Sequence, residues 1–220
     1  MACQCRIDIG RVEKSLRAVQ RQFDRINDTL EMRREAMQDD IVTNMLAGYT
    51  YVNMLLEQDI NPLHPKQLDH FLELNNIVLC GTDPQARFHY SGYIEATKRR
   101  FYTQDHFSIA NVRAWAERHK QDTPWKRAAG VYILQLSRPQ LFEEGNHRSG
   151  ALLMSCILVR NGKPPFVLTV DNAKAYFDPS SLAKETHKTF IGVYYKLPKI
   201  KKKFSRFLER ESKKQMLIKS

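Results

Sequence analysis

The densest group of chemically capable side chains lies at residues 140–148, where the sequence reads Gln-Leu-Phe-Glu-Glu-Gly-Asn-His-Arg. The apolar run that follows, residues 149–159, predicts a buried helix. Asn146 is a favourable helix cap, so the backbone N–H groups just after it lack helical acceptors and can hold an anion. This segment therefore predicts an anion seat at the start of a helix.

Two charged side chains fit such a seat. Arg148 places a cation in the first helical turn, where a positive charge is unfavourable for the helix alone and so indicates a phosphate partner. Glu144 precedes the turn and could supply an oxygen ligand to a divalent ion bound to that phosphate. The parts of a Mg-nucleotide site are present, although the same spacing also fits a capped turn between two helices.

The segment resembles the signature of the Fic/Doc family, His-x-Phe-x-(Asp/Glu)-Gly-Asn-x-Arg-x-x-Arg. The matching positions are Phe142, Glu144, Gly145, Asn146 and Arg148. We extend the resemblance over roughly residues 40–198, where it rests on helical layout. It implies an all-α fold, a Fic-like helical bundle with a small β-hairpin flap, that binds ATP and Mg. Most members resemble enzymes that move AMP from ATP to a protein hydroxyl, and Doc-like members transfer a phosphate instead.

The resemblance also implies a role for each position of the segment. Gln140 and Phe142 would occupy the catalytic part of the loop, and Glu144 would hold the metal. The nucleotide phosphates would lie against Gly145, Asn146, His147 and Arg148.

Two departures from the signature affect this chemistry. Gln140 stands where the family has the His that serves as general base, and Ala151 replaces the closing Arg. An amide has no useful proton affinity near neutral pH, and loss of general-base catalysis costs about 10²–10⁴ in rate. The missing Arg removes a second phosphate contact. His147 could act as a displaced base, but we expect a surface histidine, since the positive end of the helix dipole disfavours its protonated form.

Two functions from different classes follow. The chain is either a weakened or altered Fic-like transferase or a non-catalytic module that binds a nucleotide or a protein partner. Gln140 favours the module, whereas the retained Glu144 and Arg148 favour the transferase. A third hypothesis, binding of nucleic acid through the basic C-terminus, has less support.

The composition is that of an ordinary globular protein. The chain has 220 residues, with 42% hydrophobic and 27% charged side chains. No run of about 18 apolar residues occurs, so no membrane span is expected. The sequence contains no CxxC pair and no apolar stretch near its first residues, so we expect a reducing cytoplasm and no secretory signal.

The net charge of +11 is concentrated at the C-terminal end. Residues 196–220 contain ten Lys or Arg against two acidic side chains, which accounts for +8. The Lys-rich segment followed by Phe204, Phe207 and Leu208 predicts a basic amphipathic helix. Such a helix could contact an acidic partner or an anionic surface, or could simply be solvated.

We divide the chain into an N-terminal helical pair (1–62), a Fic-like core (63–198) and a basic C-terminal helix or tail (199–220). The first helix carries a seam of apolar residues that packs on the second helix or, less simply, on a second copy: Val12, Leu16, Val19, Phe23, Ile26 and Leu30. Ser108 and Thr123-Pro124 are signals for the start of later helices.

Residues 81–104 interrupt the helical pattern and are rich in aromatic side chains. Phe88–Tyr93 and Lys98–Tyr102 are candidate strands of the flap near 88–102, which would dock a protein target by strand addition. An ordinary packed loop is the alternative. A self-inhibitory Ser-x-x-x-Glu pair, Ser205 and Glu209, lies on the terminal helix, but the Arg that such a Glu would contact is replaced by Ala151.

Overall fold

The computed structural model describes residues 5–103, 107–189, 192–211 and 216–219. The first half of the chain forms β1 (Cys5–Ile7), α1 (Ile9–Arg21), α2 (Phe23–Asn27), α3 (Asp39–Glu57), α4 (Asp69–Cys80), α5 (Pro84–His89) and α6 (Ser91–Tyr102). The second half forms α7 (Ile109–Arg118), α8 (Pro124–Leu136), α9 (Asn146–Arg160), α10 (Ala173–Glu185), the π-helix η1 (Gly192–Lys196), α11 (Leu197–Glu211) and β2 (Leu217–Lys219).

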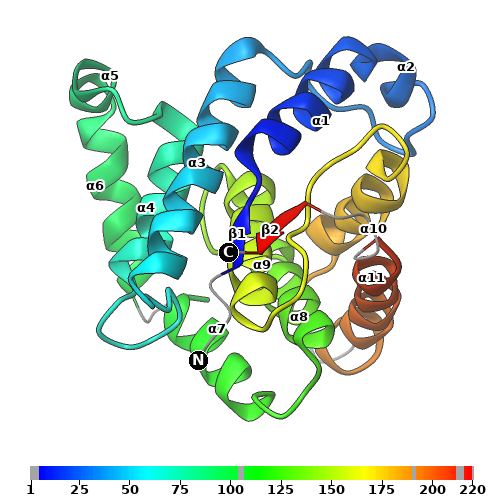
Figure 1. The fold of residues 1–220 in the computed structure, drawn as a ribbon. Helices are drawn as coiled ribbons and strands as arrows, with labels where there is room; N and C mark the ends of the chain where they lie inside the picture. Colours follow the sequence, from blue (N-terminus) through cyan, green and yellow to red (C-terminus); the bar gives the residue numbers. More distant parts are fainter. Residues whose placement is uncertain (1–4, 104–106, 190–191, 212–215, 220) are drawn as a thin grey trace.

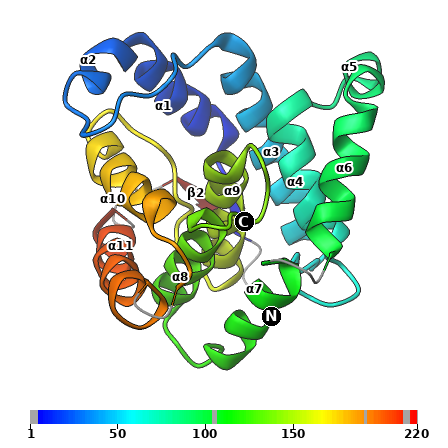
Figure 2. The same ribbon diagram turned by 180° about the vertical axis from the view of Figure 1, so that it is seen from behind.

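Helix α9 is the centre of the bundle. It packs against α8, α3 and α4, and every residue from Ser149 to Val159 is buried. Helices α5 and α6 lie on one side of this centre, and α10 and α11 lie on the other (Figure 1 and, from behind, Figure 2). The predicted buried helix after the Gly-Asn turn is therefore confirmed.

The predicted helix starts at residues 108 and 123 are also confirmed. Ser108 and Asn111 form a capping box at the start of α7. Thr123 accepts a hydrogen bond from the Lys126 backbone N–H, and Pro124 occupies the first turn of α8.

The prediction that the apolar seam from Val12 to Leu30 lies on one long helix is wrong, because the chain bends at Gln22 and forms α1 and α2 instead. The apolar seam survives the bend: Val12 and Leu16 belong to the main core, while Phe23 and Ile26 pack with Ala173 of α10. One straight helix could not pack on both α3 and α10, so the first part of the seam faces α3 and the second part faces α10.

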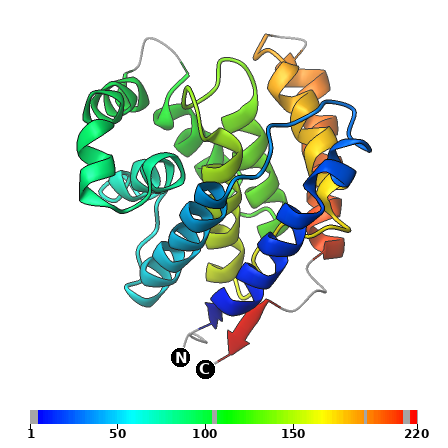
Figure 3. The same ribbon diagram turned by 90° about the horizontal axis from the view of Figure 1, so that it is seen from above.

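The all-α fold with one small two-stranded sheet is confirmed, but its strands are not where the aromatic residues suggested. The described strands β1 and β2 pair antiparallel, with Cys5 opposite Lys219 and Ile7 opposite Leu217. This pairing brings the first and the last described segments of the chain side by side (Figure 3).

Residues 84–89 and 91–102 are helical, so the predicted strands at 88–93 and 98–102 are wrong. Asp83 caps α5 by accepting from the Ala86 N–H, and Pro84 favours its first turn. In α6, Thr97 and Phe101 are buried at a spacing of four, which fits a helix packed on one face. Capping and helical burial override the β-propensity of the aromatic residues here.

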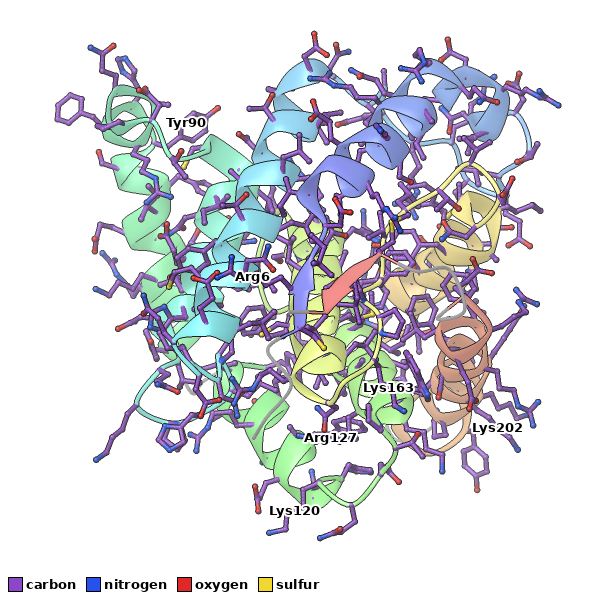
Figure 4. The ribbon with its side chains drawn as sticks, viewed as in Figure 1. Arg6, Tyr90, Lys120, Arg127, Lys163 and Lys202 are labelled. Atoms are coloured by element: carbon purple, nitrogen blue, oxygen red, sulfur yellow. The ribbon has the colours of Figure 1, made fainter. Side chains whose placement is uncertain are left out.

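Helix α11 has the predicted basic, amphipathic character. Its apolar face is buried: Leu197, Ile200, Phe204, Phe207 and Leu208. On the opposite face Lys202 is exposed and projects away from the body (Figure 4). One cluster of buried side chains runs from Ile7 to Leu208, so residues of all three predicted parts share a core, and the division itself stays a prediction. Among the described helices, none has the length and apolar character needed to span a bilayer.

Close packing of α7 on α8 holds the helix that leads into the loop before α9. The Trp115 ring lies so close to Gly130 that a Cβ there would be 1.8 Å from its Cη2 atom. The same ring stacks on His119, with centroids 4.0 Å apart, and receives the Lys201 ammonium 4.7 Å from its centroid. The indole therefore has little room to retreat.

We expect Gly130→Ala to lower the free energy of unfolding by about 1–3 kcal/mol, because the new methyl group overpacks against Trp115. Gly92→Ala is the matched control: its Cβ meets nothing within 4 Å, and Ala within α6 should stabilise by about 0.5–1 kcal/mol. Urea unfolding followed by circular dichroism measures both. Equal stability of wild type and Gly130→Ala would contradict this packing.

Candidate functional site

The loop of residues 137–145 connects α8 to α9 and ends on Gly145. Gly145 caps α9 with φ +73°, a left-handed conformation that favours glycine. A Cβ at this position would lie 2.7 Å from the Asn75 Nδ2 atom. That Nδ2 donates to the Glu144 carbonyl at 3.0 Å, so α4 braces the turn from behind.

Asn146 closes the loop with two hydrogen bonds to one residue. Its Oδ1 accepts from the Phe142 N–H at 3.0 Å, and its Nδ2 donates to the Phe142 carbonyl at 2.7 Å. The predicted cap at Asn146 is wrong by one position, because Gly145 takes the cap and Asn146 is the first helical residue. The buried carboxamide serves the loop, since both of its polar atoms are already paired within it.

Phe142 anchors the loop in the core. Its fully buried ring stacks on Phe101 of α6, with centroids 5.4 Å apart, and meets Phe71 of α4 edge-on at 5.5 Å. Nothing of this ring faces solvent, so its role in the structure is to hold the loop against α4 and α6.

Gln140 lies half-buried under α6. Arg100 donates to the Gln140 carbonyl at 3.3 Å and forms an ion pair with Glu143 at 3.5 Å. The segment predicted as a flap thus covers the loop, but it does so as a helix and through an arginine.

Glu144 presents its side chain to solvent, and no described residue pairs with its carboxylate. No group of three or more His, Cys, Asp or Glu side chains that could hold a metal occurs in the described part of the chain. A divalent ion held by Glu144 would therefore need other oxygen ligands, such as phosphate and water.

Arg148 turns towards α4, where its Nη1 donates to the Val78 carbonyl. Burial lowers the pKa of the guanidinium, and the carboxylates of Asp40, Glu144 and Glu35 oppose that shift. Arginine stays protonated in proteins, so this side chain remains a fixed cation beside the first turn of α9.

His147 is turned inward, so the expectation of a surface histidine is wrong. Its Nε2 lies 3.4 Å from Arg34 Nη1, and its Nδ1 lies 3.1 Å from Tyr132 Oη. Because a guanidinium can only donate, Nε2 accepts and the ring proton belongs on Nδ1, facing Tyr132. The Tyr132 hydroxyl then donates to Ser180 Oγ at 2.9 Å.

The charge state of His147 follows from this setting. Burial, followed by the positive charges of Arg34, Lys184 and Arg148, lowers the pKa of the imidazole to about 3. The ring is therefore neutral near physiological pH, and its one lone pair is directed at a cation.

The sequence offered no signal for the side chains that support this site from other segments. Arg34, between α2 and α3, donates to Ser181 Oγ at 2.6 Å and lies over the Phe177 ring at 5.3 Å. Asn75 and Arg100 brace the loop from α4 and α6. Each lies beside other polar residues in its own segment, so nothing in the sequence marks it out, and only the fold brings it to the loop.

Lys188 supports the first half of the loop. Its ammonium donates to the carbonyls of Ser137 and Pro139 and lies 3.6 Å from the centroid of Phe107. Burial and the neighbouring Lys201 lower the pKa of Lys188 to about 7. Two carbonyl acceptors and an aromatic face favour the charged form, so we interpret Lys188 as a donor that holds the loop.

Comparison with known proteins connects this architecture to a fold. No protein-family model matches the chain, and no curated protein is similar to it in sequence. Among solved structures, a fragment of Fic-1 from C. elegans matches with a TM-score of 0.51 and 19% identity, covering 94% of this chain and 58% of that one. A Fic-1 fragment with a glutamate-to-glycine substitution gives 0.49 and 20%, covering 90% and 60%.

The chain thus spans less than two thirds of the Fic-1 fragments that it resembles. At this level of identity the similarity concerns the fold and not the activity. The chain has a Fic-like helical fold, with the loop of residues 137–145 and helix α9 at its centre.

Proposed function

We propose that this chain is a Fic-like module that binds a nucleotide phosphate at the start of α9 and transfers AMP weakly or not at all. The observation that carries the proposal is that the first turn of α9 presents free N–H donors while Gln140 stands where the family signature has its histidine base. Binding and chemistry are argued separately below.

The geometry of the turn supports phosphate binding. The first hydrogen bond of α9 runs from the Ser149 N–H to the Gly145 carbonyl at 2.9 Å. The N–H groups of Asn146, His147 and Arg148 precede it and have no acceptor within the helix. These donors, the positive end of the helix dipole and the fixed charge of Arg148 favour an anion.

The side chains around the loop do not support proton removal from an attacking hydroxyl. The Gln140 amide cannot accept a proton near neutral pH. His147, with a pKa of about 3 and its Nε2 lone pair directed at Arg34, is unsuited to the task. Ala151 supplies only a methyl group to the wall where the family signature has an Arg. A rate lower by about 10²–10⁴ than that of a complete site follows from the missing base alone.

Mg-ATP is the ligand that the resemblance implies, and the residues fit it in part. Glu144 would hold the ion, and the first turn of α9 with Arg148 would hold the phosphates. The ion would neutralise phosphate charge. The chain would then hold a nucleotide that a protein partner recognises.

The fold changes how the partners proposed from the sequence could bind. Docking of a protein target near residues 88–102 cannot use strand addition, because α5 and α6 are helices there. An acidic partner could still bind the exposed basic face of α11, where Lys202 and Lys203 are exposed. A cytoplasmic location also stays a prediction.

We expect the chain to bind Mg-ATP and Glu144→Gln to weaken that binding roughly tenfold, because the amide is a poorer ligand for a divalent ion. Glu143→Gln is the matched control, since the carboxylate of Glu143 is next in sequence and is already paired with Arg100. Isothermal calorimetry with and without Mg measures both variants. Absence of binding by the wild type would refute the proposed nucleotide site.

We expect labelled ATP to leave no AMP on the chain or on lysate proteins above background. Gln140→His alone should gain little AMP-transfer activity. The double variant with Ala151→Arg should gain more activity than Gln140→His and Ala151→Arg combined, because a base is useless when the phosphate is misplaced. Autoradiography of all four proteins measures this. Robust labelling by the wild type that persists in Gln140→Ala would overturn weak transfer.

The neutral state of His147 has a consequence for stability. In the unfolded chain the imidazole takes up a proton near its usual pKa of about 6.5, whereas in the folded chain it does so only near 3. The stability that depends on the neutral ring is therefore complete above about pH 6.5 and is lost as the pH falls below it.

Between about pH 7.5 and pH 5, the free energy of unfolding should fall by about 1–2 kcal/mol more for wild type than for His147→Gln. Glutamine can still accept from Arg34 and donate to Tyr132, but it does not titrate. His64→Gln, at an exposed position, should behave as wild type. Chemical unfolding at both pH values provides the comparison, and parallel curves for wild type and His147→Gln would show that the ring is protonated in the native state.

A further inference from the structure

A cavity of about 160 Å³ lies beside the loop, on the side of α9 that faces the N-terminal helices. Its walls come from α1, α2, α3, α9, α10 and the segment just before α10. Most of them are apolar: Leu16, Met45, Tyr49, Leu168, Tyr176 and Phe177. Ala151 of α9 completes the wall with a methyl group, which leaves the space open.

The polar side chains of the cavity are gathered at α9 and the segment before α3. They are Arg34, Glu35, His147 and Arg148. No described carboxylate lies within ion-pair distance of Arg34 or Arg148, although Asp40, Glu144 and Glu35 act on the Arg148 charge from farther away. The Nε atom of Arg34 is also buried without a hydrogen-bond partner among the described residues. A buried guanidinium nitrogen without a partner is costly, and its satisfaction by an anion would remove that cost.

We propose that this cavity binds a small organic carboxylate with an aryl or short acyl tail. The volume is close to that of an engineered apolar cavity of about 150 Å³ that holds benzene, so a single ring or a few methylenes fit. The carboxylate would lie against Arg34 and Arg148, since a guanidinium fork matches a carboxylate well. Glu35 also lines the cavity, and its charge favours a monoanion over a phosphate dianion.

This site adjoins the nucleotide seat and shares Arg148 with it, so Mg-ATP should compete with the carboxylate where both bind. The tail-binding walls belong to α1, α3 and α10, whereas the phosphate seat is formed by the loop and the backbone of α9's first turn. Only the cavity uses Arg34 and the apolar walls, so the preference for an acid over an uncharged analogue tests this proposal whether or not the chain binds a nucleotide.

The test is calorimetric titration of the full chain with phenylpropionate and with phenylpropanol, its uncharged analogue of similar shape. We expect the acid to bind at least roughly tenfold more tightly than the alcohol, because only the acid gains charge-assisted bonds from the guanidinium groups. Arg34→Gln should remove this preference. Arg33→Gln is the matched control, because Arg33 is exposed and paired with Asp28, and it should leave the preference unchanged.

Ala151→Leu should fill the cavity and abolish binding of both compounds. Circular dichroism establishes whether that variant folds, and if it does not, the Arg34→Gln and Arg33→Gln pair decides alone. Equal affinity for acid and alcohol, or an unchanged acid affinity in Arg34→Gln, would overturn the proposal.

Discussion

The carboxamide of Asn146 hydrogen-bonds both backbone groups of Phe142, and this pair of bonds determines where the loop ends and α9 begins. A buried amide with both polar atoms satisfied is worth more than its bonds alone, because losing either partner leaves the other unpaired in the core. Phe142 is in turn held between Phe71 and Phe101. The turn, the orientation of the first N–H groups of α9 and the position of Arg148 all depend on this arrangement.

Such a loop can remain intact while its chemistry is altered. Its shape comes from Gly145, Asn146 and Phe142, none of which titrates, whereas proton transfer would come from residue 140 and phosphate contacts partly from residue 151. The structural residues and the chemical residues are therefore largely different sets. A substitution in the second set therefore leaves the contacts that shape the loop in place.

The charges around His147 link the loop to the cavity. Arg34, Arg148 and Lys184 all disfavour a proton on the ring, and burial adds to their effect. A neutral His147 can accept from Arg34, and this contact helps to hold the guanidinium near the cavity. An anion bound to Arg34 and Arg148 would offset the positive potential, so ligand binding and the protonation of His147 should be coupled.

The sequence by itself determined the helical class of the chain, the buried helix after the Gly-Asn turn and the starts of α7 and α8, because apolar periodicity and capping act within a few residues. It also singled out the loop before α9, and the resemblance carried by that loop predicted the Fic-like fold that the structure shows. The tertiary structure decided the rest. Residues 91–102 formed a helix that buries Thr97 and Phe101, Asn146 turned to Phe142, and His147 turned inward to Tyr132. Arg34 reached the site across 113 residues of sequence. Local patterns specify which backbone state is favourable, but the direction of a side chain and its distant partners depend on how the helices pack.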